Sequence, residues 1–156
     1  MQVQRLKLFG FFALMLFLEG CTISQNVVPI DASKEISKIY VQKNDKVLME
    51  EFHPELLKQL NELGFATESY STDLPKEASY YMNYTANWMW DMAMYLYYFK
   101  ATVYEQAKEA GFSKTVGEVE YDAKMGGANM NKFGHTADKI RPLLQELFAK
   151  VKRKSN

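Results

Sequence analysis

The sequence is poor in the residues that build covalent links, metal sites and rigid turns. Its 156 residues include one cysteine, two histidines and four prolines, and the formal net charge is zero. One cysteine excludes an intramolecular disulfide, and His53 and His135 lack the paired spacing that places two metal ligands on one helix face. Lysine and arginine do not cluster in the body of the chain, which excludes a nucleic-acid-binding surface. We therefore expect no metal, no cofactor and a fold held by apolar packing.

Long apolar runs are also absent. The longest stretch, residues 8–18, has eleven residues, whereas a membrane-spanning helix needs about 20. Arg5 and Lys7 precede this run, and Gly20 and Cys21 follow it. This order is typical of a lipoprotein signal peptide, with a small residue just before the cleavage point. We predict that residues 1–20 are removed and that Cys21 becomes the lipidated N-terminus, so that the protein contacts the membrane through this anchor.

The residue after the cysteine predicts the location. In Gram-negative lipoproteins an Asp at this position usually retains the protein in the inner membrane, so by resemblance Thr22 points to the outer membrane, facing the periplasm. Residues 21–34 are polar and irregular and predict a tether. Residues 35–149 have the length and the apolar content of one domain, and residues 150–156 form a tail with four basic residues.

Hydrophobic periodicity predicts the elements of that domain. Residues 36–41 and 65–71 predict short strands, and helical spacing between them ends at Gly64, which suits a left-handed C-cap. Residues 115–124 alternate as a strand with one polar face. A last helix follows Thr136, its expected N-cap, with Pro142 predicting a kink or a later start near Ile140.

An aromatic segment lies in the middle of the chain. From Tyr80 to Trp90 the even positions are mainly apolar, which predicts a half-buried strand with Trp88 and Trp90 in the core. After Asp91 the odd positions become apolar, and this change of phase predicts a bend or hairpin. A helix over residues 87–98 is the alternative, because methionine and leucine favour helices and neither glycine nor proline marks a turn. The opposite strand face supplies the candidate binding residues: Tyr81, Met89, Tyr98 and Tyr104.

The order strand, helix, four strands, helix predicts an α+β fold. It consists of a single mixed, largely antiparallel five-stranded sheet with two helices on one face. The other face is left for water or for a partner.

Two motifs carry a family resemblance. One is the run Met-Gly-Gly-Ala-Asn-Met-Asn-Lys-Phe-Gly-His-Thr at residues 125–136, with the helix that follows it up to Leu147-Phe148. The other is Asn87-Trp88-Met89-Trp90-Asp91 with Tyr95-Leu96. In these motifs the chain resembles a family of small uncharacterised proteobacterial lipoproteins. That family has no assigned activity, so the resemblance implies no catalytic residues. The order of elements is also similar to small periplasmic lipoprotein domains that assemble envelope machines.

Few residues could support chemistry. His53 and His135 have no nucleophile or base partner that the sequence reveals, and the acidic pairs Glu50-Glu51 and Glu118 with Glu120 are typical of solvated surfaces. Gly126-Gly127 before a helix is compatible with anion binding or with an ordinary turn. We therefore predict that the protein is not an enzyme. The expected function is an interaction or assembly module that docks on an envelope protein. The alternative is binding of peptidoglycan or another envelope glycan, and an enzyme is the third hypothesis.

Overall fold

The computed structural model describes residues 23–107, 112–124 and 129–152. Cys21, Thr22 and the Gly126-Gly127 pair lie outside these ranges. Within them the elements follow in this order: β1 (Ser24–Val28), β2 (Lys38–Gln42), α2 (Phe52–Glu62), β3 (Ala66–Tyr70), β4 (Tyr80–Asp91), β5 (Ala93–Gln106), β6 (Ser113–Asp122), the 3-10 helix η1 (Met130–Phe133) and α3 (Thr136–Leu147).

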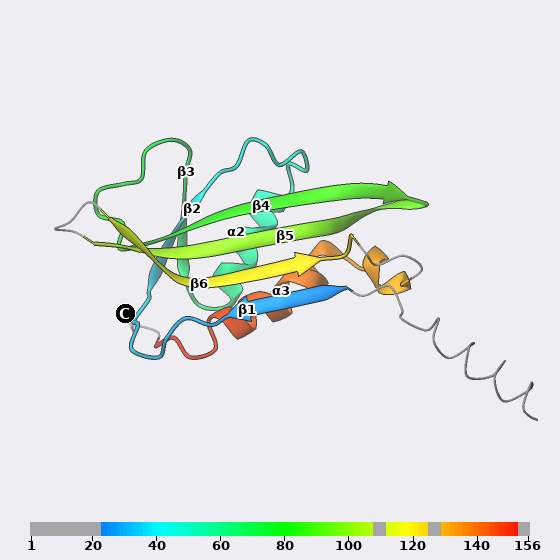
Figure 1. The fold of residues 1–156 in the computed structure, drawn as a ribbon. Coiled ribbons are helices and arrows are strands. Elements are labelled where there is room, and N and C mark those ends of the chain that lie inside the picture. Colours follow the sequence, from blue (N-terminus) through cyan, green and yellow to red (C-terminus); the bar gives the residue numbers. More distant parts are fainter. Residues whose placement is uncertain (1–22, 108–111, 125–128, 153–156) are drawn as a thin grey trace, which may run out of the picture.

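The strands form one mixed sheet in the order β1-β6-β5-β4-β2-β3. β2 runs parallel to both of its neighbours, and the other pairs are antiparallel. Both α-helices lie behind the same face of this sheet (Figure 1). The predicted α+β class and the mixed sheet are confirmed, but the described residues form six strands rather than five.

The additional strand comes from the segment that we expected to be a tether. β1 pairs with β6, with Val27 opposite Val119, and Ile23 and Val27 pack against the core. At the other terminus Val151 is buried, and the backbone of Lys152 pairs with Glu35. The packed unit therefore extends beyond the predicted limits of 35 and 149. An edge strand is stabilised mainly through backbone hydrogen bonds, so its side chains show little apolar pattern.

The connection between β2 and β3 is the predicted helix, α2. In α2 the side chains of Phe52, Leu56 and Leu60 are buried at helical spacing, and Gly64 has a φ of 91° just beyond the helix end. Pro54 lies in the first turn, where its missing N–H costs no helical hydrogen bond. This helix covers the β2 side of the sheet.

The aromatic segment forms a long hairpin. β4 and β5 pair from Tyr80 with Glu105 to Asp91 with Ala93, so the alternative helix over residues 87–98 is wrong. The turn residue Met92 has a φ of 61°. A bulge leaves Tyr97 without a β4 partner, because Asn87 pairs with Tyr98 and Trp88 with Leu96.

The second helix begins earlier than Pro142 suggested. α3 starts at Thr136, its N-cap is His135 rather than Thr136, and Pro142 lies inside the helix. Burial of Ile140, Leu144 and Leu147 against the sheet stabilises the helix despite the proline.

The core is aromatic where α2 begins. The Phe52 ring contacts Tyr84, Trp88 and Phe99, with centroid distances of 5.4, 5.2 and 5.6 Å. Trp88 is half-buried in this contact, whereas Trp90 is 68% exposed. The prediction that Trp90 lies in the core is wrong. Phe52, the first residue of α2, packs on Trp88, and the hairpin extends beyond this contact, so that Trp90 is exposed.

The two tryptophans should differ in their effect on stability. Replacing Trp88 with Ala removes the edge-on contact with Phe52 and should lower the free energy of unfolding by about 2 kcal/mol, below the full core value because the ring is half-buried. Replacing Trp90 with Ala should change it by less than about 0.5 kcal/mol. Urea unfolding of the two variants beside the parent protein measures both effects. Equal losses would show that the tip of the hairpin is packed.

Candidate functional site

The sheet face opposite the helices carries a group of tyrosines. We call the part of this face formed by β4, β5 and β6 the open face, because no element among the described residues lies over it (Figure 1). Cross-strand pairing puts Tyr81 opposite Tyr104 here. Their rings stack with centroids 4.9 Å apart and planes inclined by 15°. Two of the four predicted binding residues are therefore direct neighbours.

A third tyrosine joins this pair from the edge strand β3. The hydroxyl of Tyr70 donates a hydrogen bond to Oδ1 of Asn83 over 3.2 Å. Burial raises the pKa of Tyr70 to about 12, with further contributions from the hydroxyls of Tyr81 and Tyr104. The Tyr70 phenol therefore stays protonated at physiological pH and keeps its hydrogen bond to Asn83. Tyr70 was not among the predicted binding residues, because the short polar strand around it has only a weak hydrophobic pattern.

The other two predicted residues lie farther along the hairpin. Tyr98 is on the open face beneath the ammonium group of Lys124, which is 4.4 Å from the ring centroid. Met89 is near the hairpin turn, where its sulfur accepts a hydrogen bond from the Tyr95 hydroxyl over 3.5 Å. Tyr104 lies six positions after Tyr98 along β5, a span of about 20 Å. The structure therefore does not unite the four residues in one site.

Polar side chains fill the space between these two groups. Nζ of Lys100 lies 2.9 Å from Glu118 and 3.8 Å from Glu120. The hydrogen bond to Glu118 raises the pKa of Lys100. Thr102 also donates to Glu118, over 3.2 Å. The acidic pair that the sequence placed on a solvated strand is therefore held in a charge network at the centre of the open face.

The open face ends at β2. Tyr40 lies on the same face as Tyr81 but is buried, because Lys38 covers its ring at 4.5 Å and Glu77 from the β3–β4 loop accepts a hydrogen bond from its hydroxyl. The exposed part of the face is thus limited to the three antiparallel strands and the Tyr70 side chain.

A second polar cluster surrounds His53. Nδ1 of His53 is 2.9 Å from the Tyr84 hydroxyl, and Nε2 is hydrogen-bonded to Oγ of Ser69. These residues come from α2, β4 and β3. His53 and Tyr84 also line a hollow of about 600 Å³ together with Lys43 and Asn44. Chain folding thus gives His53 two partners that its sequence neighbours did not reveal.

The chemistry open to this cluster is restricted. Burial lowers the pKa of His53 below its ordinary value of 6.5, and the charge of Lys43 acts in the same direction. In a catalytic triad the third group is a carboxylate that stabilises the protonated imidazole. Tyr84 occupies that position here, and the pKa of its hydroxyl is raised mainly by burial. The arrangement therefore suits a neutral imidazole that joins three elements.

The remaining candidates stay apart. His135 is exposed at the start of α3, and no group of three or more His, Cys, Asp or Glu side chains among the described residues could hold a metal ion. Cys21 and Gly126-Gly127 lie outside the part of the chain that the structure describes. No helix within that part is both long enough and apolar enough to cross a bilayer.

Acid should weaken the fold through His53. Since its pKa is depressed in the folded state, the unfolded chain binds the proton more readily below about pH 6.5. The free energy of unfolding should then fall as the pH drops through the folded-state pKa and stay constant above 6.5. Replacing His53 with Gln, which can still hydrogen-bond Ser69 and Tyr84, should remove this loss.

Urea unfolding across this pH range gives the profile, and His135→Gln is the matched control on an exposed histidine. An unchanged profile in His53→Gln would contradict the assignment.

Comparisons with known proteins yield only distant structural likenesses. No protein-family model matches the sequence, and no curated protein does. The PelC dodecamer from Paraburkholderia phytofirmans is similar over 86% of this chain and 100% of its own, with 8% identity and a TM-score of 0.49. A single-substitution variant of the same protein covers 86% and 98%, with 9% identity and a TM-score of 0.46. These likenesses carry no argument about the role of the present protein.

Proposed function

We propose that the protein is a lipid-anchored module of the bacterial envelope that docks a partner protein on its open face and performs no catalysis itself. The observation that carries this proposal is the stacked pair Tyr81 and Tyr104 on a sheet face that no described element covers. Tyrosine is enriched at protein interfaces because it offers a large rigid ring and a hydroxyl group.

The surroundings of the tyrosine pair support a protein partner. The phenols of Tyr81 and Tyr104 can donate hydrogen bonds to a partner. The hydroxyl of Tyr70 donates to Asn83, which orients it, and its oxygen can still accept a hydrogen bond. The Lys100 network with Glu118 and Glu120 lies beside them and supplies both signs of charge. An aromatic centre with a polar border is the usual composition of a transient interface.

Glycan binding receives less support from this geometry. A sugar stacks on the face of an aromatic ring, but Tyr81 and Tyr104 each use one face against the other. On the open face the pair therefore offers hydroxyl groups and ring edges better than a flat platform. Peptidoglycan or another envelope glycan is the second candidate.

The anchor and the location rest on the sequence. The leader with Cys21 supports lipidation, and Thr22 supports the outer membrane, with the domain facing the periplasm. The resemblance to small proteobacterial lipoproteins supports the same placement. The absence of catalysis is proposed because His53 has a phenol where a triad requires a carboxylate.

Removal of the lipidation site should abolish the mature, lipid-anchored form of the protein. In a Cys21→Ser variant the leader cannot be processed at a lipid-modified cysteine, so the mature membrane-bound species should disappear. Fractionation of cells with mass analysis of the N-terminus measures this, and Ser33→Ala serves as a neutral control. Recovery of an unmodified N-terminus from membranes of the parent strain would contradict the proposal.

Docking on the open face should be detectable by crosslinking in intact cells. A photoreactive amino acid at Tyr104 should give one discrete protein adduct, because this position faces the partner. Adding Tyr81→Ser should reduce its yield about tenfold, the effect expected when a central tyrosine is lost. The control position is Leu48, which is 90% exposed on the β2–α2 loop.

The outcome separates the two candidates. An adduct that disappears after digestion of peptidoglycan would favour glycan binding. Equal adducts from Tyr104 and Leu48 would contradict any specific use of the open face.

A further inference from the structure

The tip of the β4–β5 hairpin is unusually apolar for an exposed turn. Four side chains near the turn are exposed although large and apolar: Met89, Trp90, Met92 and Met94. Trp90 and Met94 are direct cross-strand partners, and Met89 lies on the other side of the hairpin, opposite Tyr95. Both sides of the tip are therefore apolar, and an exposed group of this kind marks a contact surface.

The turn residue itself points to a role outside the fold. Met92 has a φ of 61°, in the left-handed region that glycine adopts without strain, and its side chain is 78% exposed. A methionine here costs backbone energy and gains no packing in return. Strain at an exposed position is a reason to look for an external contact of that side chain.

The one acidic side chain at the tip, that of Asp91, forms an ion pair. Oδ2 of Asp91 lies 2.5 Å from Nζ of Lys132 in η1, and Lys132 is itself buried. η1 is held against the hairpin by this ion pair and by the edge-on contact of Phe133 with Tyr95, whose centroids are 5.5 Å apart. A paired carboxylate costs less to bring into a medium of low polarity than a free one.

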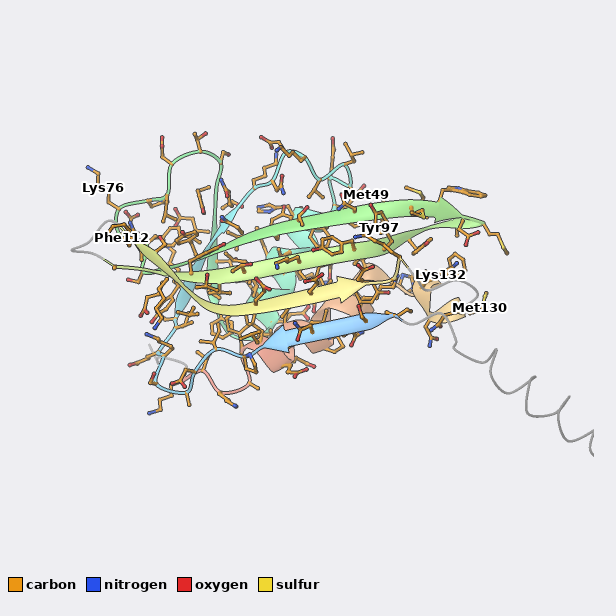
Figure 2. All side chains as sticks on the ribbon, viewed as in Figure 1. Met49, Lys76, Tyr97, Phe112, Met130 and Lys132 are labelled. Atoms are coloured by element: carbon orange, nitrogen blue, oxygen red, sulfur yellow. The ribbon has the colours of Figure 1, made fainter. Side chains whose placement is uncertain are left out.

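η1 adds a further exposed apolar side chain at the same end. Met130 is 68% exposed. Figure 2 shows Met130 and Lys132 at the end of the molecule toward which the hairpin extends, and Phe112 at the opposite end. The apolar tip therefore belongs to one end of the domain.

The predicted lipid anchor enters at this end. Ile23 lines a hollow of about 630 Å³ together with Asn129 and Asn131 of the η1 region. Ser24 pairs with Asp122, and Asp122 pairs with Tyr98, so β1 begins level with Tyr98 of the hairpin. Only two residues separate Ser24 from Cys21.

The length of the hairpin beyond Ser24 can be compared with the length of chain between Ser24 and Cys21. From Tyr98 to Met92 the hairpin extends about 20 Å beyond the level of Ser24. The three residue steps from Ser24 back to Cys21 span at most about 11 Å. If the strands point at the membrane, the tip extends past the lipidated residue by roughly 10 Å, the upper end of the roughly 5–10 Å to which interfacial side chains are buried.

We propose that the tip formed by Met89, Trp90, Met92 and Met94 inserts into the phospholipid interface beside the anchor and fixes the domain upright. This inference rests on the proposed lipid anchor. Tryptophan is favoured at the membrane interface, since its ring is apolar and its N–H is polar. Insertion holds the strand axis along the membrane normal, so the open face is turned sideways into the periplasm.

The protein's two tryptophans supply the test. The full chain, purified from membranes, is reconstituted in phosphatidylethanolamine and phosphatidylglycerol vesicles with lipids brominated near the headgroup. In a Trp88→Phe variant the emission from Trp90 should shift to the blue and fall about twofold. In a Trp90→Phe variant the emission from Trp88, packed on Phe52, should stay constant.

A third variant controls for exposure. Phe112 is 77% exposed at the far end, and Phe112→Trp in a chain with both native tryptophans changed to Phe should show no quenching. Quenching at this position equal to that of Trp90 would overturn the upright orientation. Emission of Trp90 that changes with protein concentration and not with lipid would assign the tip to a second copy and overturn the proposal.

The proposed lipid anchor and the proposed insertion of the tip are tested separately by this experiment. A chain that does not sediment with the vesicles overturns both. A chain that sediments while its Trp90 remains unquenched overturns tip insertion and leaves the anchor intact. Met92→Gly tests the strain argument, because its melting temperature should equal or exceed that of the parent protein. A lower melting temperature would show that the Met92 side chain serves the fold.

Discussion

The mismatch in length between the helices and the central hairpin determines most of this structure. α2 and α3 have 11 and 12 residues, and β4 and β5 have 12 and 14. A helix of this size is about 18 Å long, whereas a strand of equal residue number is about 40 Å long. The helices can therefore bury only the middle of the hairpin, on one face. The opposite face must be compatible with water, which the Lys100 network and the tyrosine hydroxyls provide. Beyond Trp88 the hairpin is contacted by η1, through Phe133 against Tyr95 and Lys132 against Asp91, and the apolar side chains of the tip stay exposed.

The elements that face the helices were predictable because each has one buried side. The period of two in β4, the change of phase after Asp91 and the stripe of α2 all reflect contact with a single core. β1 was missed because an edge strand is stabilised by its backbone, and Trp90 was misplaced because periodicity gives the side of a strand but not where its cover ends. η1 was missed because one turn of helix is too short to show a period.

The site was predictable only in part. Period-two alternation identified Tyr81 and Tyr104, and cross-strand register then stacked them. Tyr98 has the same phase but lies on a different stretch of the face, since phase carries no information on distance along a strand. The cluster of His53, Ser69 and Tyr84 joins three elements that are separated in sequence, and no spacing could have indicated it.

Pairing of β1 with β6 sets an order of events during folding. Ser24 pairs with Asp122, 98 positions later in the chain, so β1, the first described strand, cannot dock before β6, the last one, is available. Closing so long a segment is entropically slow. Until β1 docks, the outer edge of β6 is unpaired and open to association with other chains. Docking of β1 and protection of the β6 edge are therefore the same step, and a delay in docking prolongs the exposure of that edge.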